Sequence, residues 1–176
     1  MPRLLAVTAT VMALELSRGE AARLGAPPAV LAIAGAGLGA VALAFPPAAL
    51  GLSVRSLPLR LLGGIALAVT LLLPAAVRIP GQPIPGPAYA LALTVIAAGE
   101  EIGFRGALYA AIESAFGPLV AVLGSATLFT AGHALSHPPQ YLAAVAAAGL
   151  LLGAWRWACR DLVGPVVGHV LADLAI

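Results

Sequence analysis

Seven apolar runs, separated by proline, glycine and arginine, take up most of this chain and decide what it can fold into. The runs are residues 4–16, 29–45, 57–77, 88–116, 118–135, 141–157 and 163–176. Only 9% of the 176 residues are charged, whereas a soluble domain carries about a quarter charged residues to cover its surface. The surroundings of the folded chain must therefore be lipid. One crossing of a bilayer takes about 20 apolar residues, so the length allows six or seven crossings and no separate soluble domain.

The runs predict helices rather than strands. A structure that crosses lipid is a helical bundle or a closed barrel, and none of the runs alternates apolar and polar residues as barrel strands do. We therefore expect an all-α fold, a polytopic transmembrane helical bundle of six to seven helices, in one membrane-embedded domain over residues 1–176. Residues 57–176 would form its motif-bearing core. Residues 1–26 are expected to form a retained helix that is short or lies in the interface, because several charged residues follow the first run.

Turn-forming residues predict where the helices end. The expected breaks are residues 17–20, 45–47, 78–81, 116–118, 137–139 and 161–165. Gly35, Gly37 and Gly39 lie inside the second run, where small residues favour close packing of helices. If every segment crosses, the side richer in arginine is the cytoplasmic one, which places the N-terminus inside. That side carries Arg3, Arg55, Arg60, Arg156 and Arg160, and the opposite side carries Arg18, Arg23 and Arg78.

Three charged residues lie deep inside the fourth run. Glu100, Glu101 and Arg105 each cost about 2.5 to 3.5 kcal/mol at bilayer depth, so something must compensate them. On a helix, Glu101 and Arg105 are four residues apart on one face and form an ion pair. One arginine does not neutralise two carboxylates. The remaining glutamate is protonated, bound to another polar group, or in contact with water, which describes a candidate general base.

The partners of these charges are expected on later segments. His133 follows Phe129 by four residues in the fifth run, and His169 precedes Asp173 by four residues in the seventh. Each of these pairs lies on one face of its helix. Side chains this polar are satisfied together only if the three helices bring them into one cluster. The sequence therefore predicts a buried polar site inside an apolar bundle.

The order and spacing of these residues resemble those of a known family. The motifs are Glu100-Glu101-x-x-x-Arg105, Phe129-x-x-x-His133 and His169-x-x-x-Asp173. They are similar to the CPBP family of intramembrane proteases, also called the type II CAAX prenyl endopeptidase or abortive-infection family, over roughly residues 57–176. The resemblance implies a glutamate-dependent endopeptidase of the plasma membrane, a multi-pass protein whose partners are membrane lipid and a membrane-anchored peptide or protein substrate.

The resemblance also implies roles for the site residues. Glu100 would be the general base and His133 would help it hold the attacking water, while Glu101 and Arg105 would fix the geometry. His169 and Asp173 would lie on the oxyanion side. An ionised Asp173 repels an oxyanion, so it would be protonated, act through His169, or face a metal.

Three alternatives stay open beside this interpretation. Two histidines and a carboxylate are a sufficient catalytic zinc set, although the HExxH spacing is absent; we expect no cofactor and treat zinc as the second choice. A non-catalytic scaffold or immunity-type membrane protein would keep the polar core for packing alone. A small proton-coupled transporter is the third, and it lacks support from an internal inverted repeat. The arginines are scattered singly, which excludes the clustered basic face that nucleic acid requires.

Overall fold

The computed structural model describes residues 1–53, 55–76 and 86–175, and in these ranges the chain is helical with no strand. The prediction of an all-α fold is confirmed. The predicted break at residues 78–81 lies outside the described residues. The elements, in chain order, are α1 (Pro2–Arg23), α2 (Pro28–Ala40), the 3-10 turn η1 (Val41–Ala44), α3 (Pro47–Leu50), α4 (Leu57–Ala76), α5 (Pro87–Glu101), the π-helix η2 (Ile102–Leu108), α6 (Tyr109–Phe116), α7 (Pro118–Gly132), the 3-10 turn η3 (His133–Leu135), α8 (Pro139–Cys159) and α9 (Val163–Ala175).

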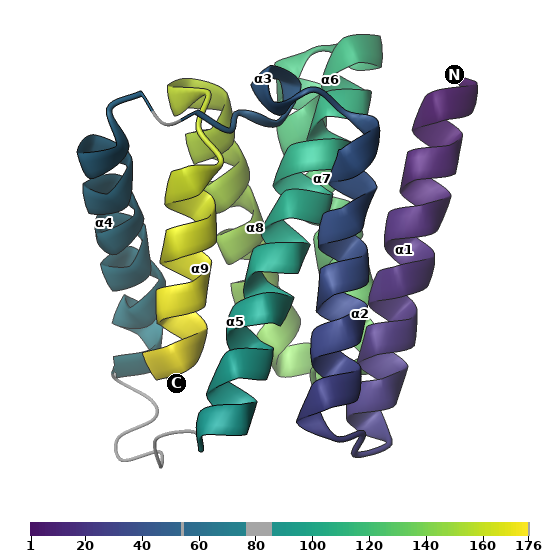
Figure 1. The fold of residues 1–176 in the computed structure, drawn as a ribbon, viewed down its shortest axis with the longest axis vertical. Coiled ribbons are helices and arrows are strands. Elements are labelled where there is room, and N and C mark those ends of the chain that lie inside the picture. Colours follow the sequence, from purple (N-terminus) through teal and green to yellow (C-terminus); the bar gives the residue numbers. More distant parts are fainter. Residues whose placement is uncertain (54, 77–85, 176) are drawn as a thin grey trace.

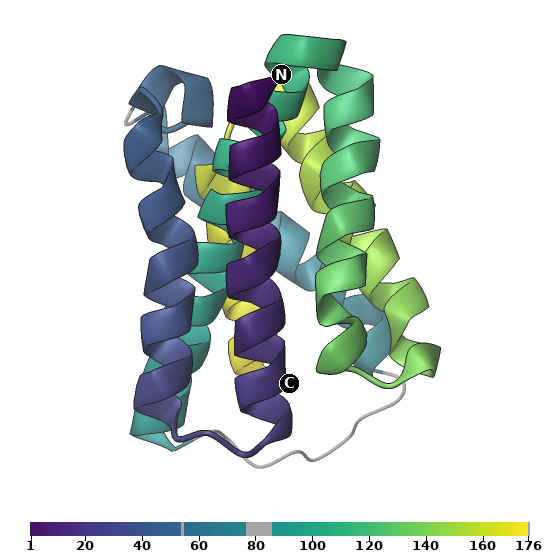
Figure 2. The same ribbon diagram turned by 90° about the vertical axis from the view of Figure 1, so that its right-hand side faces the viewer.

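The helices form two layers. Figure 1 shows α4, α9, α5, α2 and α1 side by side, with α7 and α8 behind them. The view from the side places α1 in front and α7 and α8 along one edge (Figure 2). In this arrangement α5 lies between α9 and α2 in the first layer, and the second layer, with α7 and α8, lies behind it.

Proline and glycine set the boundaries of most helices. Many of the helices, among them α2, α5, α7 and α8, have proline at their first position, where its fixed φ suits a helix and its missing N–H costs nothing. Gly117 has a φ of +83° and lets the chain reverse between α6 and α7, a conformation that glycine adopts without a steric penalty. The breaks predicted near residues 45–47, 116–118 and 137–139 are confirmed.

The break predicted at residues 17–20 is wrong. The structure continues α1 through these residues to Arg23, so the first helix has 22 residues and is not short. Val7, Val11, Glu15 and Arg18 all lie on its buried face. The charges of Glu15 and Arg18 therefore do not end the helix, because they pair with each other inside the bundle rather than facing solvent.

Close packing joins α2 to α5, as the glycines of the second run predict. A Cβ atom added to Gly99 would lie 1.9 Å from the carbonyl oxygen of Gly35, and one added to Gly35 would lie 2.7 Å from the Cα of Ile96. The two backbones therefore touch at this point. Since Gly99 directly precedes Glu100, this contact fixes the place of the fourth run's first charged residue.

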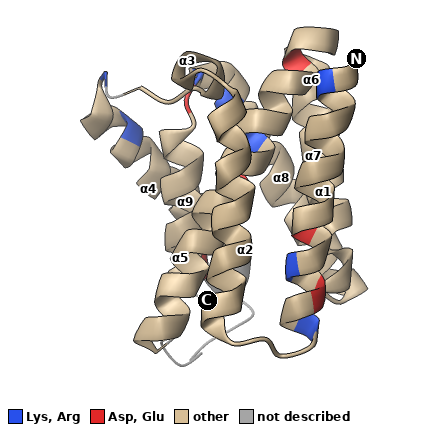
Figure 3. Ribbon diagram, turned by 45° about the vertical axis from the view of Figure 1, so that its right-hand side comes forward, with Lys and Arg blue, Asp and Glu red and all other residues tan. Residues whose placement is uncertain are grey.

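The outer surface of the bundle is largely apolar. Many large hydrophobic side chains are exposed, including Ile33, Leu43 and Leu59, each at 70% or more. Figure 3 shows charged residues mainly near the two ends of the bundle and on a few helical turns inside it. Within the described part of the chain, Pro118–Leu135 and Pro139–Cys159 have both the length and the hydropathy needed to cross a bilayer, and three shorter helices are similarly apolar.

Candidate active site

The structure brings together all six residues that the sequence singled out. Glu100 and Glu101 end α5, and Arg105 lies within η2. His133 begins η3, directly after α7, and α9 carries the remaining pair, His169 and Asp173. Each residue of the set lies within 4 Å of another of its members.

Glu101 connects two of the helices. Its Oε1 atom accepts from Arg105 Nη1 and lies 2.8 Å from His169 Nδ1, and the Arg105 contact is also 2.8 Å. A carboxylate only accepts hydrogen bonds, so an ionised Glu101 makes Nδ1 of His169 the donor. The remaining nitrogen of that ring, Nε2, consequently faces the rest of the site.

The Arg105 side chain is held by an aromatic ring as well as by Glu101. Its guanidinium carbon lies 4.0 Å from the centroid of the Phe129 ring, a cation–π geometry. On the α8 side, a Cβ added to Gly149 would lie 3.4 Å from Arg105 Nη2, so this glycine leaves space for the guanidinium. Phe129 also packs against His133, with ring centroids 4.2 Å apart. One phenyl ring thus orients a charge and an imidazole.

The Glu100 carboxylate faces both histidines without a direct hydrogen bond to either. Glu100 Oε2 lies 3.7 Å from His133 Nε2 and 3.9 Å from His169 Nε2. The orientation of His133 is fixed from behind, because its Nδ1 lies 2.9 Å from the Phe129 carbonyl oxygen and donates to it. Its Nε2 is therefore the nitrogen that is free to act on a group placed beside Glu100.

The site opens gradually toward α9. The side chain of Glu100 is 3% exposed and that of His133 is 7% exposed, whereas His169 is 13% and Asp173 is 27% exposed. His169 Nε2 lies 3.5 Å from Asp173 Oδ1. Asp173, the acid at the end of the third motif, is thus the most accessible of these four side chains, and Glu100 is the most deeply buried of them.

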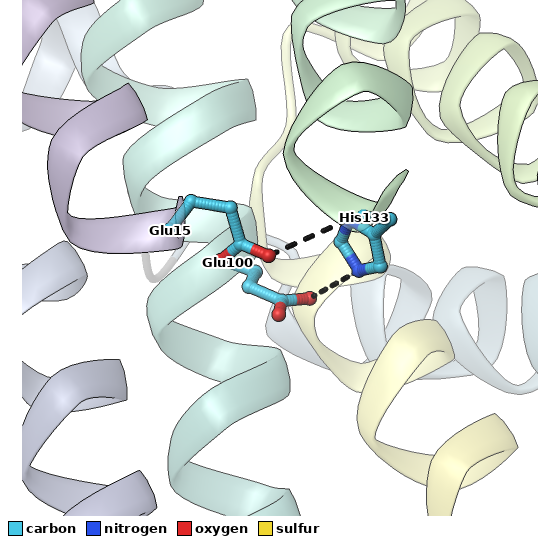
Figure 4. Close-up of side chains that lie close together, drawn as sticks. All are labelled: Glu15, Glu100 and His133. Atoms are coloured by element: carbon cyan, nitrogen blue, oxygen red, sulfur yellow. Dashed lines mark ion pairs between the residues drawn. The ribbon is translucent and has the colours of Figure 1, made fainter. Parts of the chain in front are cut away.

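Two further residues of the site come from α1, and the sequence reasoning missed them. Glu15 and Arg18 are both buried. Arg18 Nε lies 3.1 Å from Glu100 Oε1, and Glu15 Oε1 lies 3.6 Å from His133 Nδ1. Figure 4 shows Glu15 and Glu100 reaching His133 from separate helices.

A signal for these residues was present in the sequence. Val7, Val11 and Glu15 follow one another at intervals of four, and Arg18 follows three residues later. This is the spacing of a single helical face, so the apolar face of the first helix continues into the charged pair. Reading the charges as the end of a membrane segment concealed that continuity.

Glu15, Glu100 and His133 also offer ligand atoms that lie within 4.8 Å of one another. Two carboxylates and an imidazole are chemically suitable for zinc. However, Arg18 contacts both of these carboxylates, so a guanidinium already supplies positive charge to them. The Nδ1 atom of His133 is occupied by the Phe129 carbonyl, which leaves only Nε2 for a metal. A metal could therefore use His133 Nε2, but it would have to compete with Arg18 for the carboxylates of Glu15 and Glu100.

Comparison with known proteins gives one result. The sequence profile described as type II CAAX prenyl endopeptidase Rce1-like matches residues 82–175, more than half of the chain. No curated protein and no solved structure matches the chain. The matched range contains all three motifs and the helices α5 to α9 that carry them. The chain therefore belongs to the Rce1-like family of type II CAAX prenyl endopeptidases.

Proposed function

We propose that this protein is a multi-pass intramembrane endopeptidase of the plasma membrane, with Glu100 as its general base. The family is a membrane-embedded protease family. The observation that carries the proposal is the position of Glu100 Oε2, which lies 3.7 and 3.9 Å from the Nε2 atoms of two histidines inside an apolar bundle. The exposed apolar side chains and the two long apolar helices support the membrane location.

The first step is the activation of water. A water molecule about 2.8 Å from Glu100 Oε2 is also within hydrogen-bond distance of His133 Nε2, because these two atoms are 3.7 Å apart. Glu100 takes a proton from this water, and the oxygen forms a bond to the scissile carbonyl carbon. When the C–N bond breaks, Glu100 returns the proton to the leaving nitrogen. A positioned base of this kind contributes about 10² to 10⁴ in rate.

His169 takes the role of stabilising the oxyanion in this proposal. The imidazole donates to Glu101 through Nδ1, and its Nε2 lies 3.5 Å from Asp173 Oδ1, within the range of a charge–charge attraction. Both nitrogens carry a proton only in the imidazolium form. In that form Nε2 donates to the carbonyl oxygen as its negative charge grows. Asp173 then acts through His169 rather than by direct contact with the oxyanion, which is one of the three roles that the sequence left open.

The substrate we propose is a peptide or protein held at the membrane by a lipid or an apolar segment. The site lies among apolar helices, and the most accessible of its side chains, Asp173, belongs to α9. A substrate anchored in the same bilayer reaches such a site without leaving lipid. The family name refers to prenylated CAAX proteins, and a farnesylated CAAX peptide is therefore the first probe to use.

The experiment compares purified wild-type protein with Glu100→Gln and His133→Ala, reconstituted in vesicles with a quenched fluorescent farnesylated CAAX peptide. We expect cleavage by the wild-type protein and its loss in both variants, with elution and thermal unfolding that remain those of a folded protein. Wild-type cleavage by Glu100→Gln would remove the general-base role. If both variants unfold at lower temperature and the wild-type protein cleaves nothing, the scaffold interpretation is correct.

The zinc alternative is tested on the same samples. Its support is the cluster of Glu15, Glu100 and His133, and the contact of Arg18 with both carboxylates favours the metal-free reaction. We expect full activity after exhaustive chelation and less than one zinc per protein. Stoichiometric zinc together with complete loss of cleavage on chelation would reverse this preference.

A further inference from the structure

We propose that α1 contributes to catalysis through Arg18, a positioning residue that holds the carboxylate of Glu100, and that Glu15 in turn holds Arg18. The inference rests on the proposed function of Glu100. The family profile matches residues 82–175 and so does not include α1. Nothing in that match assigns a role to the first helix.

The contacts divide the two oxygens of Glu100 between two tasks. Arg18 Nε lies 3.1 Å from Oε1, whereas Oε2 is the oxygen that faces the histidines of η3 and α9. The single N–H of Arg18 Nε is donated to Glu15, so the contact with Glu100 is an ion pair, and its attraction favours the carboxylate orientation that keeps Oε1 beside the guanidinium. Oε2 is thereby directed at the place where water and the scissile carbonyl must meet, and a misplacement of about 1 Å there costs about 10² in rate.

Arg18 is itself held by Glu15. Its Nε donates to Glu15 Oε2 at 3.0 Å, and its Nη2 pairs with Glu15 Oε1. Such a two-point contact fixes the plane of a guanidinium, which a lysine ammonium does not reproduce. Glu15 Oε1 also lies 3.6 Å from His133 Nδ1. The pair on α1 therefore touches both groups that would bind the attacking water.

The backbone is adapted to receive this pair. A Cβ added to Gly132 would lie 2.5 Å from Glu15 Cγ, and Gly132 directly precedes His133. One turn further along α1, a Cβ added to Gly19 would lie 3.5 Å from Leu135 Cβ. Glycine at position 132 thus leaves the space that Glu15 occupies beside the catalytic imidazole.

The same helix provides a contrast that separates this role from helix stability. Glu20 and Arg23 repeat the spacing of Glu15 and Arg18 five residues later and also form an ion pair, at 2.6 Å, but this second pair is exposed. Burying an ion pair costs desolvation that its attraction often fails to repay. Stability of α1 alone would favour the exposed arrangement at both places, so the buried pair requires another reason.

The test measures kcat and KM for Arg18→Met, Arg18→Lys and the matched control Arg23→Met, on the farnesylated CAAX peptide in vesicles, together with the unfolding temperature. We expect kcat per folded molecule to fall about 10²-fold in Arg18→Met with KM changed less than about threefold, because the substrate does not touch Arg18. Arg18→Lys should keep part of the activity, since it retains the charge and loses the two-point contact. Arg23→Met should behave as wild type in all three measurements.

Wild-type kcat in folded Arg18→Met would overturn the proposal. If Arg18→Met does not fold, Arg18→Lys decides: an unchanged kcat in that variant overturns the proposal, and a reduced kcat at unchanged KM supports it. Glu100→Gln is measured in the same series. Cleavage by Glu100→Gln would mean that the proposed function itself fails, whereas an inactive Glu100→Gln beside a fully active Arg18→Met would mean that only the role of α1 fails.

Discussion

At the scale of single residues, the buried ion pair of Glu101 and Arg105 holds His169 in place, because Glu101 contacts both Arg105 and His169. Both side chains are fully buried, and the guanidinium is enclosed by Glu101 and the Phe129 ring. Within the described residues, Arg105 Nε and Nη2 have no hydrogen-bond partner. Glu101 is the only carboxylate in direct contact with this guanidinium among the described residues, so removing Glu101 or Arg105 leaves the other charge buried without its ion-pair partner.

Arg105→Met is therefore expected to destabilise the protein strongly. Loss of the guanidinium leaves the Glu101 carboxylate buried without its cation, which costs about 3 to 5 kcal/mol. The free energy of unfolding in mixed micelles measures this, with Arg23→Met as the exposed control that should not differ from wild type. The double variant Glu101→Leu/Arg105→Met should recover most of the stability and remain inactive, because His169 has then lost its anchor. An Arg105→Met protein as stable as wild type would contradict this account of the pair.

The residues whose clustering was predicted from the sequence share one property. Glu100, His133 and His169 interrupt long apolar helices at positions where a polar side chain has no local reason to be, so their meeting was predictable. Glu15 and Arg18 were missed because they stand near the end of their run. A charged pair near the end of an apolar run is ordinarily explained by contact with water at the membrane surface. Only the packing of α1 against η3 shows that this explanation does not apply to Glu15 and Arg18.

At the scale of elements, a backbone contact between α2 and α5 fixes the position of Glu100, the proposed general base. A Cβ added to Gly99 would overlap the carbonyl oxygen of Gly35 at 1.9 Å, which no rotamer relieves. The π-helix η2 follows Glu101 directly and carries Arg105. A π-helical turn inside a longer helix often lies at a functional site. The sequence predicted one helix over residues 88–116, but hydrophobic periodicity does not distinguish an α-turn from a single π-turn.

Gly99→Ala adds a single methyl group, but we expect it to lower both stability and activity. The added methyl group must push α2 away from α5, an overpacking that typically costs about 1 to 3 kcal/mol, and it shifts the neighbouring Glu100. Gly37→Ala on α2 is the matched control, since its nearest contact would be Leu14 Cδ2 at an ordinary 3.6 Å. Thermal unfolding and cleavage rates compare the two. Equal behaviour of both variants would mean that the contact of Gly35 with Gly99 does not position Glu100.

At the scale of the whole molecule, the charged ends of the bundle differ from the arrangement expected from the sequence. Arg18 lies in the site and does not belong to a membrane surface, and Arg78 lies outside the described residues. Arg3, Arg60 and Arg156 each donate to a backbone oxygen among residues 44–51, so they gather at one end. Arg23 lies at the end of α1, beside Glu20. The excess of arginine at the end near the N-terminus is therefore greater than the sequence count indicated.

This asymmetry predicts the orientation of the protein, with the arginine-rich end in the cytoplasm. Cys159 is the single cysteine of the chain and is exposed. It ends α8, close to the Arg60 and Asp161 pair. A membrane-impermeant maleimide should label it only in inside-out vesicles. Leu24→Cys in a Cys159→Ser background should be labelled only from the opposite side, because Leu24 follows α1 and is 70% exposed.

A third position, Pro2, decides together with Leu24 how α1 lies in the membrane, because these residues lie at its opposite ends. A helix of 22 residues is about 33 Å long, enough to cross the hydrocarbon core, and Figure 1 shows α1 running alongside α2 and α5. Labelling of Pro2→Cys and Leu24→Cys from opposite sides, both in the Cys159→Ser background, means that α1 crosses and carries Glu15 and Arg18 to the depth of Glu100. Labelling of Pro2→Cys and Leu24→Cys from the same side would instead mean that α1 lies in the interface, as the charges following the first run predicted. Arg18 could then not reach Glu100 in the membrane, and the catalytic role proposed for the first helix would have to be abandoned.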